Sequence, residues 1–115
     1  MERGAQLGRY VRSSPHSHLT GDLIAEDRVF FGAGVKTVND RSMLWRTGQP
    51  VDLDPPVFRH GASIGSGSTV GAGVEVGEWA MVGSHSLALD DVPAYAIVVG
   101  SPARYLRDRT PPDIR

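Results

Sequence analysis

Apolar residues recur at every sixth position between residues 58 and 92 of the chain. The centre of this pattern is four aliphatic residues that are each followed by glycine: Ile64-Gly65, Val70-Gly71, Val76-Gly77 and Val82-Gly83. Phe58 and Ala88 extend this column by one step in each direction. Small or β-branched residues stand two positions before the column residues: Ala62, Ser68, Val74, Ala80 and Ser86. Because residues two apart in a strand lie on the same face, we expect both sets to point into one narrow interior.

A repeat of six residues has room for one short strand and one corner. A corner requires a positive φ at some position, which glycine adopts without a steric clash, and Gly67 and Gly73 recur two positions after glycines of the column. Three units then make one triangular turn, and the turns stack into a parallel β-solenoid. A flexible glycine-rich linker is disfavoured because the column is regular and proline is absent from residues 57–92.

The same column continues upstream in a degenerate form. It passes through Leu7, Ser13, Leu19, Ala25, Phe31 and Thr37. We therefore expect degenerate rungs over about residues 7–37 and regular rungs over residues 58–92. Residues 38–57 break the repeat and contain three prolines, which predicts a long loop expelled from one corner. Such loops often carry specificity, and Trp45 in this loop either stacks on a sugar or base or plugs a subunit interface.

Residues 93–115 are expected to cap the C-terminal end. Residues 96–99 read as a short apolar strand. Pro102 suits the first position of a helix with Ser101 as its N-cap, so a short C-terminal helix is predicted after the turn. The whole chain of 115 residues is thus one domain, all-β apart from that helix.

Composition excludes several classes of function. The net charge is −1 and the 12 Lys and Arg residues are scattered, which argues against a nucleic-acid partner. The absence of cysteine excludes disulfides and thiol catalysis. No apolar run approaches the ~20 residues of a membrane span and the N-terminus has no signal-peptide core, so we expect a cytoplasmic protein without a membrane partner.

The run HGASIGSGSTVGAGVEVGEWAMVGSHSLALDDVPAYAIVVGSPAR, residues 60–104, resembles the C-terminal part of hexapeptide-repeat acyltransferases. Within that family the similarity is closest to nucleotide-amino-sugar N-acetyltransferases, through VFFGAGVKTVND, VFRHGASIG and the D-V-P-x-Y-A-I-V-V-G-x-P-A-R ending. The resemblance implies a left-handed parallel β-helix. It also implies transfer of an acyl group from acetyl-CoA, or another acyl-CoA, by direct attack of a sugar amine on the thioester. The acceptor would be an amino sugar, free or nucleotide-linked.

A short prism leaves flat faces and strand edges that a monomer cannot cover. Three-fold packing joins equivalent faces of identical subunits. We therefore expect a homotrimer with its sites at the subunit interfaces.

Four residues are candidates for the chemistry. By the resemblance, Asn39 faces the amine and the acetyl sulfur, where its amide can accept from the amine and donate to the developing oxyanion. Asp40 could hold or deprotonate the amine, although Asn-Asp also opens turns. His85 is either a general base at a subunit boundary or a corner residue, because histidine tolerates the left-handed region. His60 is a weaker candidate, which we expect to meet Asn39 at the neck of the loop.

Coenzyme A is expected to bind along the corners of the prism. Three residues could offer backbone N–H groups to the pantetheine arm or the oxyanion, unless they only permit the turn: Gly65, Gly83 and Ser84. The resemblance places the G-x-P-A-R ending near the coenzyme A phosphates, which suits Arg104 and Arg107. In that ending Ser101 stands where the family usually has asparagine. The arginines could equally be the solvated end of a helix.

Three alternatives remain open. The chain could be a catalytically degenerate β-helix that serves as an assembly or partner-binding module, which its short N-terminal part favours. It could also acylate a hydroxyl group. A γ-class carbonic anhydrase would need three histidine ligands to a metal, and the four histidines (16, 18, 60 and 85) lack the required spacing, so no metal is expected.

Overall fold

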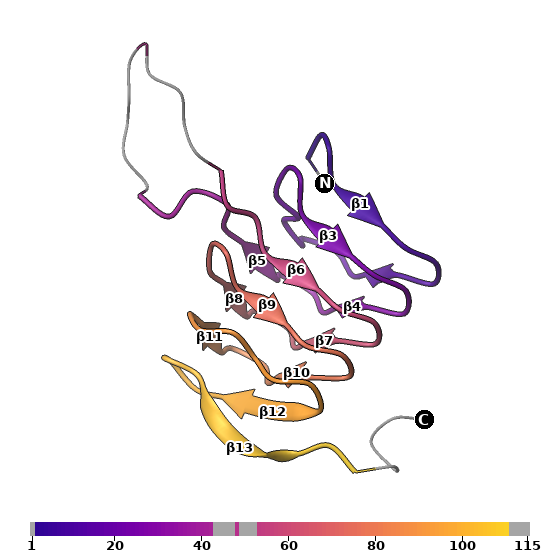
Figure 1. Ribbon diagram of the computed structural model, residues 1–115, viewed down its shortest axis with the longest axis vertical. Coiled ribbons are helices and arrows are strands. Elements are labelled where there is room, and N and C mark those ends of the chain that lie inside the picture. The colour runs from indigo at the N-terminus through magenta and orange to yellow at the C-terminus, as the bar shows by residue number, and fades with distance from the viewer. Residues whose placement is uncertain (1, 43–47, 49–52, 111–115) are drawn as a thin grey trace.

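Each six-residue unit folds as a two-residue strand followed by a tight corner, and three units complete one turn of a prism (Figure 1). The computed structural model describes residues 2–42, 48 and 53–110. Over those residues it contains thirteen strands and no helix. The left-handed parallel β-helix expected from the sequence is confirmed. Likewise, no helix long and apolar enough to cross a membrane is found among the described residues.

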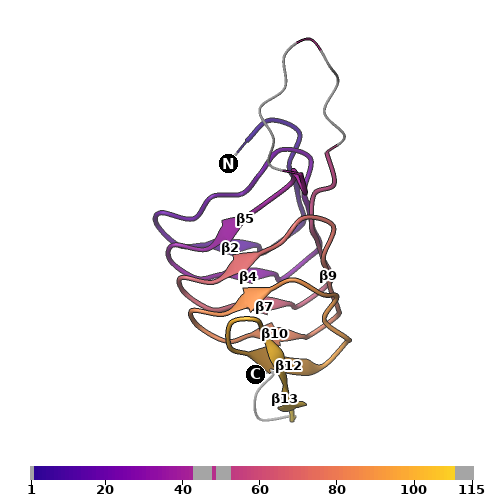
Figure 2. The ribbon, with the colours of Figure 1, turned by 90° about the vertical axis from the view of Figure 1, so that its left-hand side faces the viewer.

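Three flat sheets form the three faces of the prism, which we name A, B and C. Sheet A consists of β1 (Gln6–Leu7), β3 (Ile24–Ala25), β6 (Val57–Phe58) and β9 (Glu75–Val76). Sheet B consists of β2 (Arg12–Ser13), β4 (Phe30–Phe31), β7 (Ser63–Ile64), β10 (Met81–Val82), β12 (Ala96–Val99) and β13 (Arg104–Asp108). Sheet C consists of β5 (Lys36–Thr37), β8 (Thr69–Val70) and β11 (Leu87–Ala88). Figure 2 shows β4, β7 and β10 stacked one above the next.

The pairing register repeats every 18 residues, except across the loop and in the last coil, where Met81 pairs with Ile97. In the first coils Gln6 pairs with Ile24 in parallel, which is one full turn later. On sheet C, Lys36 pairs with Thr69, 33 residues later, because the loop between β5 and β6 is inserted there. The insertion stands at one corner, so the strands before and after it still pair as neighbouring coils.

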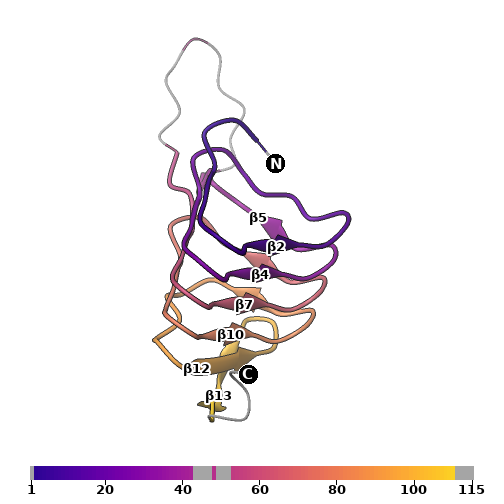
Figure 3. The ribbon, with the colours of Figure 1, turned by 90° about the vertical axis from the view of Figure 1, so that its right-hand side faces the viewer.

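The predicted C-terminal helix is wrong. The segment after the turn at residues 100–103 forms β13, which pairs antiparallel with β12. Figure 3 shows β13 next to β12 at the C-terminal end of the prism. Leu87 ties that turn to the prism, because its N–H donates to Gly100 O (2.9 Å) and its C=O accepts from Ala103 N (2.8 Å). The physical reason is that β12 is the last parallel strand and its outer edge carries backbone groups that need partners. An isolated helix of two turns is marginal in water, so pairing with that edge is preferred.

The interior is filled by the two sets of side chains that the repeat predicted. Every column residue from Leu19 to Ala88 is buried, as are all five residues that stand two positions before the regular column. Phe31 and Phe58 are the largest fully buried side chains, with their rings edge to face and their centroids 4.9 Å apart. Thr37 is the polar member of the column, and its hydroxyl both accepts from a backbone N–H and donates to a backbone C=O. The predicted core is therefore confirmed from Leu19 onwards, whereas Leu7 and Ser13 in the first coil are exposed.

Most corners hold one residue in the left-handed region, three positions after a column residue. Glycine occupies this position at residues 61, 67 and 73, with φ of 74°, 72° and 71°. At other corners the residue is bulky: Trp79 has φ 56° and His85 has φ 55°. The His85 ring fills the space above the neighbouring corner, since a Cβ on Gly67 would lie 2.5 Å from His85 Nδ1. His85 therefore occupies a corner in the left-handed region, which is one of the two roles considered for it from the sequence.

The glycines that follow the column residues serve a different purpose. They have no positive φ, and they allow the backbone of the next coil to approach. A Cβ on Gly65 would lie 2.5 Å from the backbone nitrogen of Ser84, which is far inside contact distance. A Cβ on Gly71 would come no closer than 3.3 Å, to the carbonyl oxygen of Ala88.

This difference predicts that substitution by alanine lowers the free energy of unfolding more at Gly65 than at Gly71, although both glycines follow a column residue. Gly65→Ala should lower the free energy of unfolding by about 2 kcal/mol, because the clash is with backbone that cannot move without shifting a coil. Gly71→Ala should cost less than about 1 kcal/mol. Urea unfolding followed by circular dichroism measures both values. Equal destabilisation of the two variants would contradict the close-approach argument.

The left-handed corner at His85 generates a second stability prediction. His85→Gly should change the free energy of unfolding by no more than about 1 kcal/mol, since glycine adopts φ 55° without strain. His85→Val should destabilise by about 2 kcal/mol or more, because a β-branched residue is an outlier at positive φ. The same unfolding measurement applies, and a valine variant as stable as the glycine variant would refute the assignment.

Candidate functional site

The three corners of the prism place the candidate residues in three separate groups. We name each corner by the sheets that the chain joins there: A–B, B–C and C–A. Asn39 and Asp40 follow β5 and lie at the C–A corner, where the loop leaves the prism. His60 lies between β6 and β7 at the A–B corner. His85 lies between β10 and β11 at the B–C corner.

At the C–A corner, hydrogen bonds fix the main chain and the side chains of the Asn-Asp pair. Asn39 Nδ2 donates to Gly21 O (3.3 Å), and Asn39 O accepts from the N–H of Asp54 on the returning side of the loop (2.7 Å). Asp40 Oδ1 accepts from both the N–H (3.0 Å) and the hydroxyl (2.9 Å) of Ser42. The turn that the Asn-Asp sequence suggested is thus present, and it also holds both polar side chains at the root of the loop.

At the B–C corner, small residues stack on successive coils. Gly65, Gly83 and Ser84 lie here, and Ser101 lies in the turn that follows β12, beside the same corner. The N–H of Gly65 donates to Val82 O (2.7 Å) and that of Gly83 to Val98 O (2.9 Å). These two N–H groups hold the coils together, so the idea that they bind a cofactor is not supported. Ser84 differs, because its N–H makes no backbone hydrogen bond within the described residues.

The outer face of sheet C joins these two corners and is hollowed into a groove. The groove has a volume of about 400 Å³. It is lined by Val38, Asp40, Arg41, Thr69, Gly71, Ala72, Leu87 and Leu89. Its floor is largely apolar, and Leu89 is 56% exposed. Asp40 and Arg41 stand at the C–A side of the groove, so a carboxylate and a guanidinium border a largely apolar surface.

Sequence reasoning missed Arg41, Thr69 and Leu87 as members of this groove. The residue before each column position points outwards, as the alternation of side chains in a strand requires. Leu87 is such an outward position on a short strand, and an aliphatic residue there was the signal that could have been read. The contribution of Arg41 could not be read, because it depends on how the root of the loop folds back over β8.

His60 does not join Asn39 within one chain, contrary to expectation. Its N–H donates to Glu26 Oε1 (2.9 Å), and its ring packs edge to face against Trp79 with a centroid separation of 5.3 Å. Arg59 beside it bridges Glu75 and Glu26. Hydrogen bonds to Glu75 and then Glu26 raise the pKa of Arg59 above its ordinary value. The A–B corner is therefore a packed, ion-paired edge, because the loop leaves from a different corner than the one that holds His60.

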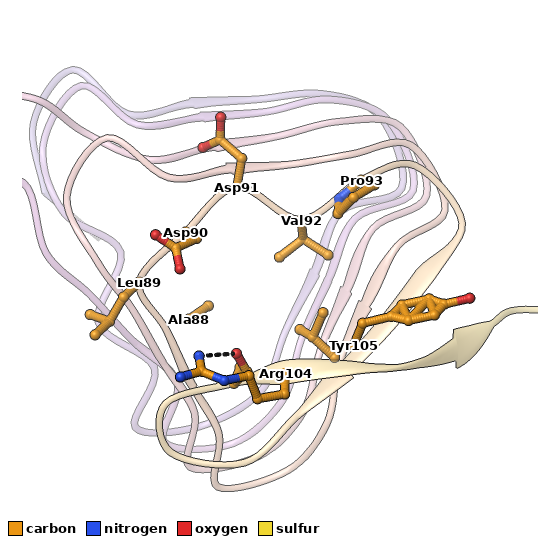
Figure 4. A pocket seen from close by; sticks show the side chains of 10 residues that line it. Ala88, Leu89, Asp90, Asp91, Val92, Pro93, Arg104 and Tyr105 are labelled. Atoms are coloured by element: carbon orange, nitrogen blue, oxygen red, sulfur yellow. Dashed lines mark hydrogen bonds between the residues drawn. The ribbon is translucent and has the colours of Figure 1, made fainter.

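The two arginines of the C-terminal segment are exposed on β13. Arg104 Nη1 donates to its neighbouring carbonyl, Ala103 O (3.3 Å), and Arg107 Nη1 donates to Asp108 O (2.9 Å). Arg104 also borders a second, smaller cavity of about 200 Å³ at the C-terminal end of the prism. Figure 4 shows Asp90 and Arg104 at its edge and Ala88 and Val92 at its floor.

Chemically, the sheet C groove can hold an extended, mainly apolar chain and present polar groups at its ends. The carboxylate of Asp40 can orient a cationic amine, and the imidazole of His85 lies at the opposite corner. No group of three or more His, Cys, Asp or Glu residues suited to a metal is found among the described residues. Trp45, the aromatic candidate in the loop, lies outside the described residues.

Comparison with solved structures shows the same architecture in acetyltransferases. A serine acetyltransferase in complex with cysteine superimposes with a TM-score of 0.80 and 26% identity, over 96% of this chain and 42% of that chain. A soybean serine acetyltransferase complexed with serine gives a TM-score of 0.76 and 25% identity, over 90% and 40%. A hexapeptide-repeat acetyltransferase from Vibrio cholerae, complexed with acetyl-coenzyme A, gives a TM-score of 0.82 and 22% identity, over 93% of this chain and 61% of that chain.

No protein-family model and no curated protein sequence matches the chain. The chain spans about two fifths of the length of the serine acetyltransferases that it matches. What the comparisons establish is therefore the fold, a left-handed parallel β-helix of the kind found in hexapeptide-repeat acetyltransferases.

Proposed function

We propose that this chain is a coenzyme A-dependent acetyltransferase whose site lies on the outer face of sheet C. The observation that carries the proposal is the groove of about 400 Å³ between the C–A and B–C corners. One side of it is bordered by Asp40, with Asn39 adjacent in the chain. Ser84 and His85 lie at the B–C corner, at the other edge of sheet C and outside the residues that line the groove. The similarity to acetyltransferases, one of them complexed with acetyl-coenzyme A, supports the same reading.

Acetyl-CoA, or another acyl-CoA, would be the co-substrate and supply the thioester. Its pantetheine arm is a long, narrow chain that suits an apolar groove with backbone donors at its edge. The Ser84 N–H can serve as such a donor, because the coil ladder does not use it. Ser101 lies at the same corner, one coil further along. Arg104 and Arg107 would bind the phosphates, because both guanidinium groups are exposed at the C-terminal end of the prism.

The reaction joins an amine nitrogen to the thioester carbonyl carbon, and the carbon–sulfur bond breaks as the thiol leaves. Asn39 Nδ2 already donates to Gly21 O, which orients the amide so that its Oδ1 can accept from the attacking amine. The carboxylate of Asp40 attracts the amine and can take its proton. His85 lies at the B–C corner, so it would act as general base only if the acceptor binds at that corner.

The acceptor that we propose is the amine of an amino sugar, free or nucleotide-linked. An amine suits this groove because its bordering acid is a carboxylate, which holds an ammonium group well but is a weak base for a hydroxyl. A hydroxyl acceptor is the second candidate. It is favoured by one observation, the similarity to serine acetyltransferases at 25–27% identity.

We further propose a cytoplasmic homotrimer in which each groove is completed by a neighbouring subunit. The exposed apolar residues of the sheet C face support this, because a monomer would leave Leu89 and the groove floor in water. Light scattering should give three times the chain mass of 12.3 kDa. A monomer at micromolar concentration would refute the shared site.

The experiment that tests the function is a free-thiol assay with acetyl-CoA against a panel of acceptors. The panel contains amino sugars, nucleotide-linked amino sugars, their hydroxyl counterparts and serine. Thiol release with an amine and not with its hydroxyl counterpart supports the proposal, and release with serine alone favours the second candidate. Calorimetry that detects no binding of coenzyme A would instead favour a non-catalytic assembly module.

Variants of the C–A corner should separate positioning from proton transfer. Asn39→Ala should lower kcat by about 10²-fold, because a group that holds the amine and donates to the oxyanion is lost. Asp40→Asn should lower it by about 10²-fold at neutral pH and less at higher pH, where more of the amine is already deprotonated. Rate profiles from pH 6 to 9 make the comparison. If His85→Asn alone abolishes turnover and removes the acidic limb, His85 is the base and this assignment fails.

The exposed arginine on β13 gives a binding prediction. Arg104→Ala should raise KM for acyl-CoA about tenfold and leave kcat nearly unchanged, the pattern of a contact that is equally strong in the ground and transition states. Steady-state kinetics with acyl-CoA as the varied substrate checks this. A large fall in kcat at constant KM would place the cofactor elsewhere.

A further inference from the structure

The two ends of the long loop are fastened to each other and to the coil below by one residue, Asp54. Its N–H donates to Asn39 O on the outgoing side of the loop (2.7 Å). Its C=O accepts from the N–H of Gly73 in the next coil (2.7 Å). Its carboxylate oxygen Oδ2 accepts from Arg41 Nη2 (2.6 Å). Main chain and side chain of Asp54 therefore contact two segments, the outgoing side of the loop through Asn39 and Arg41 and the next coil through Gly73.

Arg41 completes this fastening from the other side of the loop. Its Nη2 also reaches the carbonyl oxygen of Ala72 (3.4 Å), so the guanidinium lies across the corner of the next coil. The corner is open there because residue 73 is glycine. A Cβ at Gly73 would lie 2.2 Å from Arg41 Nη2 and 2.3 Å from Asp54 Oδ2. The Asp54–Arg41 pair thus occupies the volume that a side chain at this corner would need.

We infer that the Asp54–Arg41 pair is a positioning unit that holds Asn39 and Asp40 at the edge of the sheet C groove. The inference rests on the proposed function, since it assigns the pair to that site. Arg41 follows Asp40 directly in the chain and lines the groove with it. Fixing the guanidinium against Asp54 and Ala72 therefore fixes the backbone that carries the candidate catalytic side chains.

Exposure distinguishes this role from ordinary stabilisation. The side chains of Arg41 and Asp54 are 70% and 53% exposed, and ion pairs at such exposure add little to folding stability. Catalytic geometry is more sensitive, because a displacement of about 1 Å at a reacting group can cost 10²-fold in rate. The expected signature of the pair is thus a large effect on turnover with a small effect on unfolding.

The test uses Asp54→Ala, because Asp54 does not line the groove and its backbone hydrogen bonds are retained in the variant. We expect kcat to fall at least tenfold while KM for acetyl-CoA changes less than twofold and the melting temperature stays within about 2 °C. Asp54→Asn keeps an acceptor oxygen for Arg41 and should recover part of kcat. The charge-swapped double variant R41D/D54R should recover more than either single change.

Arg59→Gln is the matched control, because it breaks a half-exposed ion pair at the A–B corner, away from the groove. It should leave kcat unchanged. Equal kcat in Asp54→Ala and wild type, or an equal loss in Arg59→Gln, would overturn the inference.

A second readout does not depend on activity. Amide hydrogen exchange at Asp54 and Gly73 should be faster in Asp54→Ala than in wild type and unchanged in Arg59→Gln. Unchanged exchange in Asp54→Ala would count against the positioning unit even if activity fell. Faster exchange in a protein that transfers no acyl group to any acceptor would instead refute the proposed function and leave the fastening itself standing.

Discussion

The structure depends on the backbone hydrogen-bond ladder that joins each coil to the next at an interval of 18 residues. A bond such as Gly65 N to Val82 O (2.7 Å) forms only if the two coils have equal length and the same corners. Once this register is set, every third unit of the repeat falls on the same face. The interior columns, the outer faces and the corners then become continuous features that run the length of the prism.

One consequence is that each corner acquires its own chemistry along the whole molecule. The B–C corner consists mainly of small residues, which leaves a narrow edge with backbone groups near the surface. The A–B corner carries large and charged side chains, with Trp79 packed against His60 and Arg59 ion-paired with Glu75. The C–A corner is interrupted by the loop. The groove on sheet C therefore lies between two corners of different character. Its charged lining residues, Asp40 and Arg41, both lie on the C–A side.

A second consequence is that an insertion is tolerated where it leaves the ladder intact. The loop departs after β5 and returns before β6, and the pairs above and below it keep their register. The cost of such an insertion is that its root must be anchored by contacts that the repeat does not provide. Asp54 and Arg41 supply them, and they do so beside the residues to which chemistry is assigned.

The parallel solenoid and its core could be predicted from the sequence because the six-residue period is a local property that each unit repeats, whereas the left hand of the coil followed from the family resemblance. Spacing identified the buried column from Leu19 onwards and the place of the loop, and the tolerance of His85 for a corner followed from its residue type. The C-terminal helix was predicted wrongly because local preference for residues 101–109 competes with an open strand edge, and that edge exists only in the folded prism. The expected meeting of Asn39 and His60 failed for a similar reason, since their equal spacing from the column places them at different corners.

Coils that are distant in sequence but adjacent in space decided two further features. They determined which glycine N–H groups are already hydrogen-bonded and which outward side chains form a groove. The sequence by itself determined the periodic interior, whereas only the tertiary structure decided which surface positions come together.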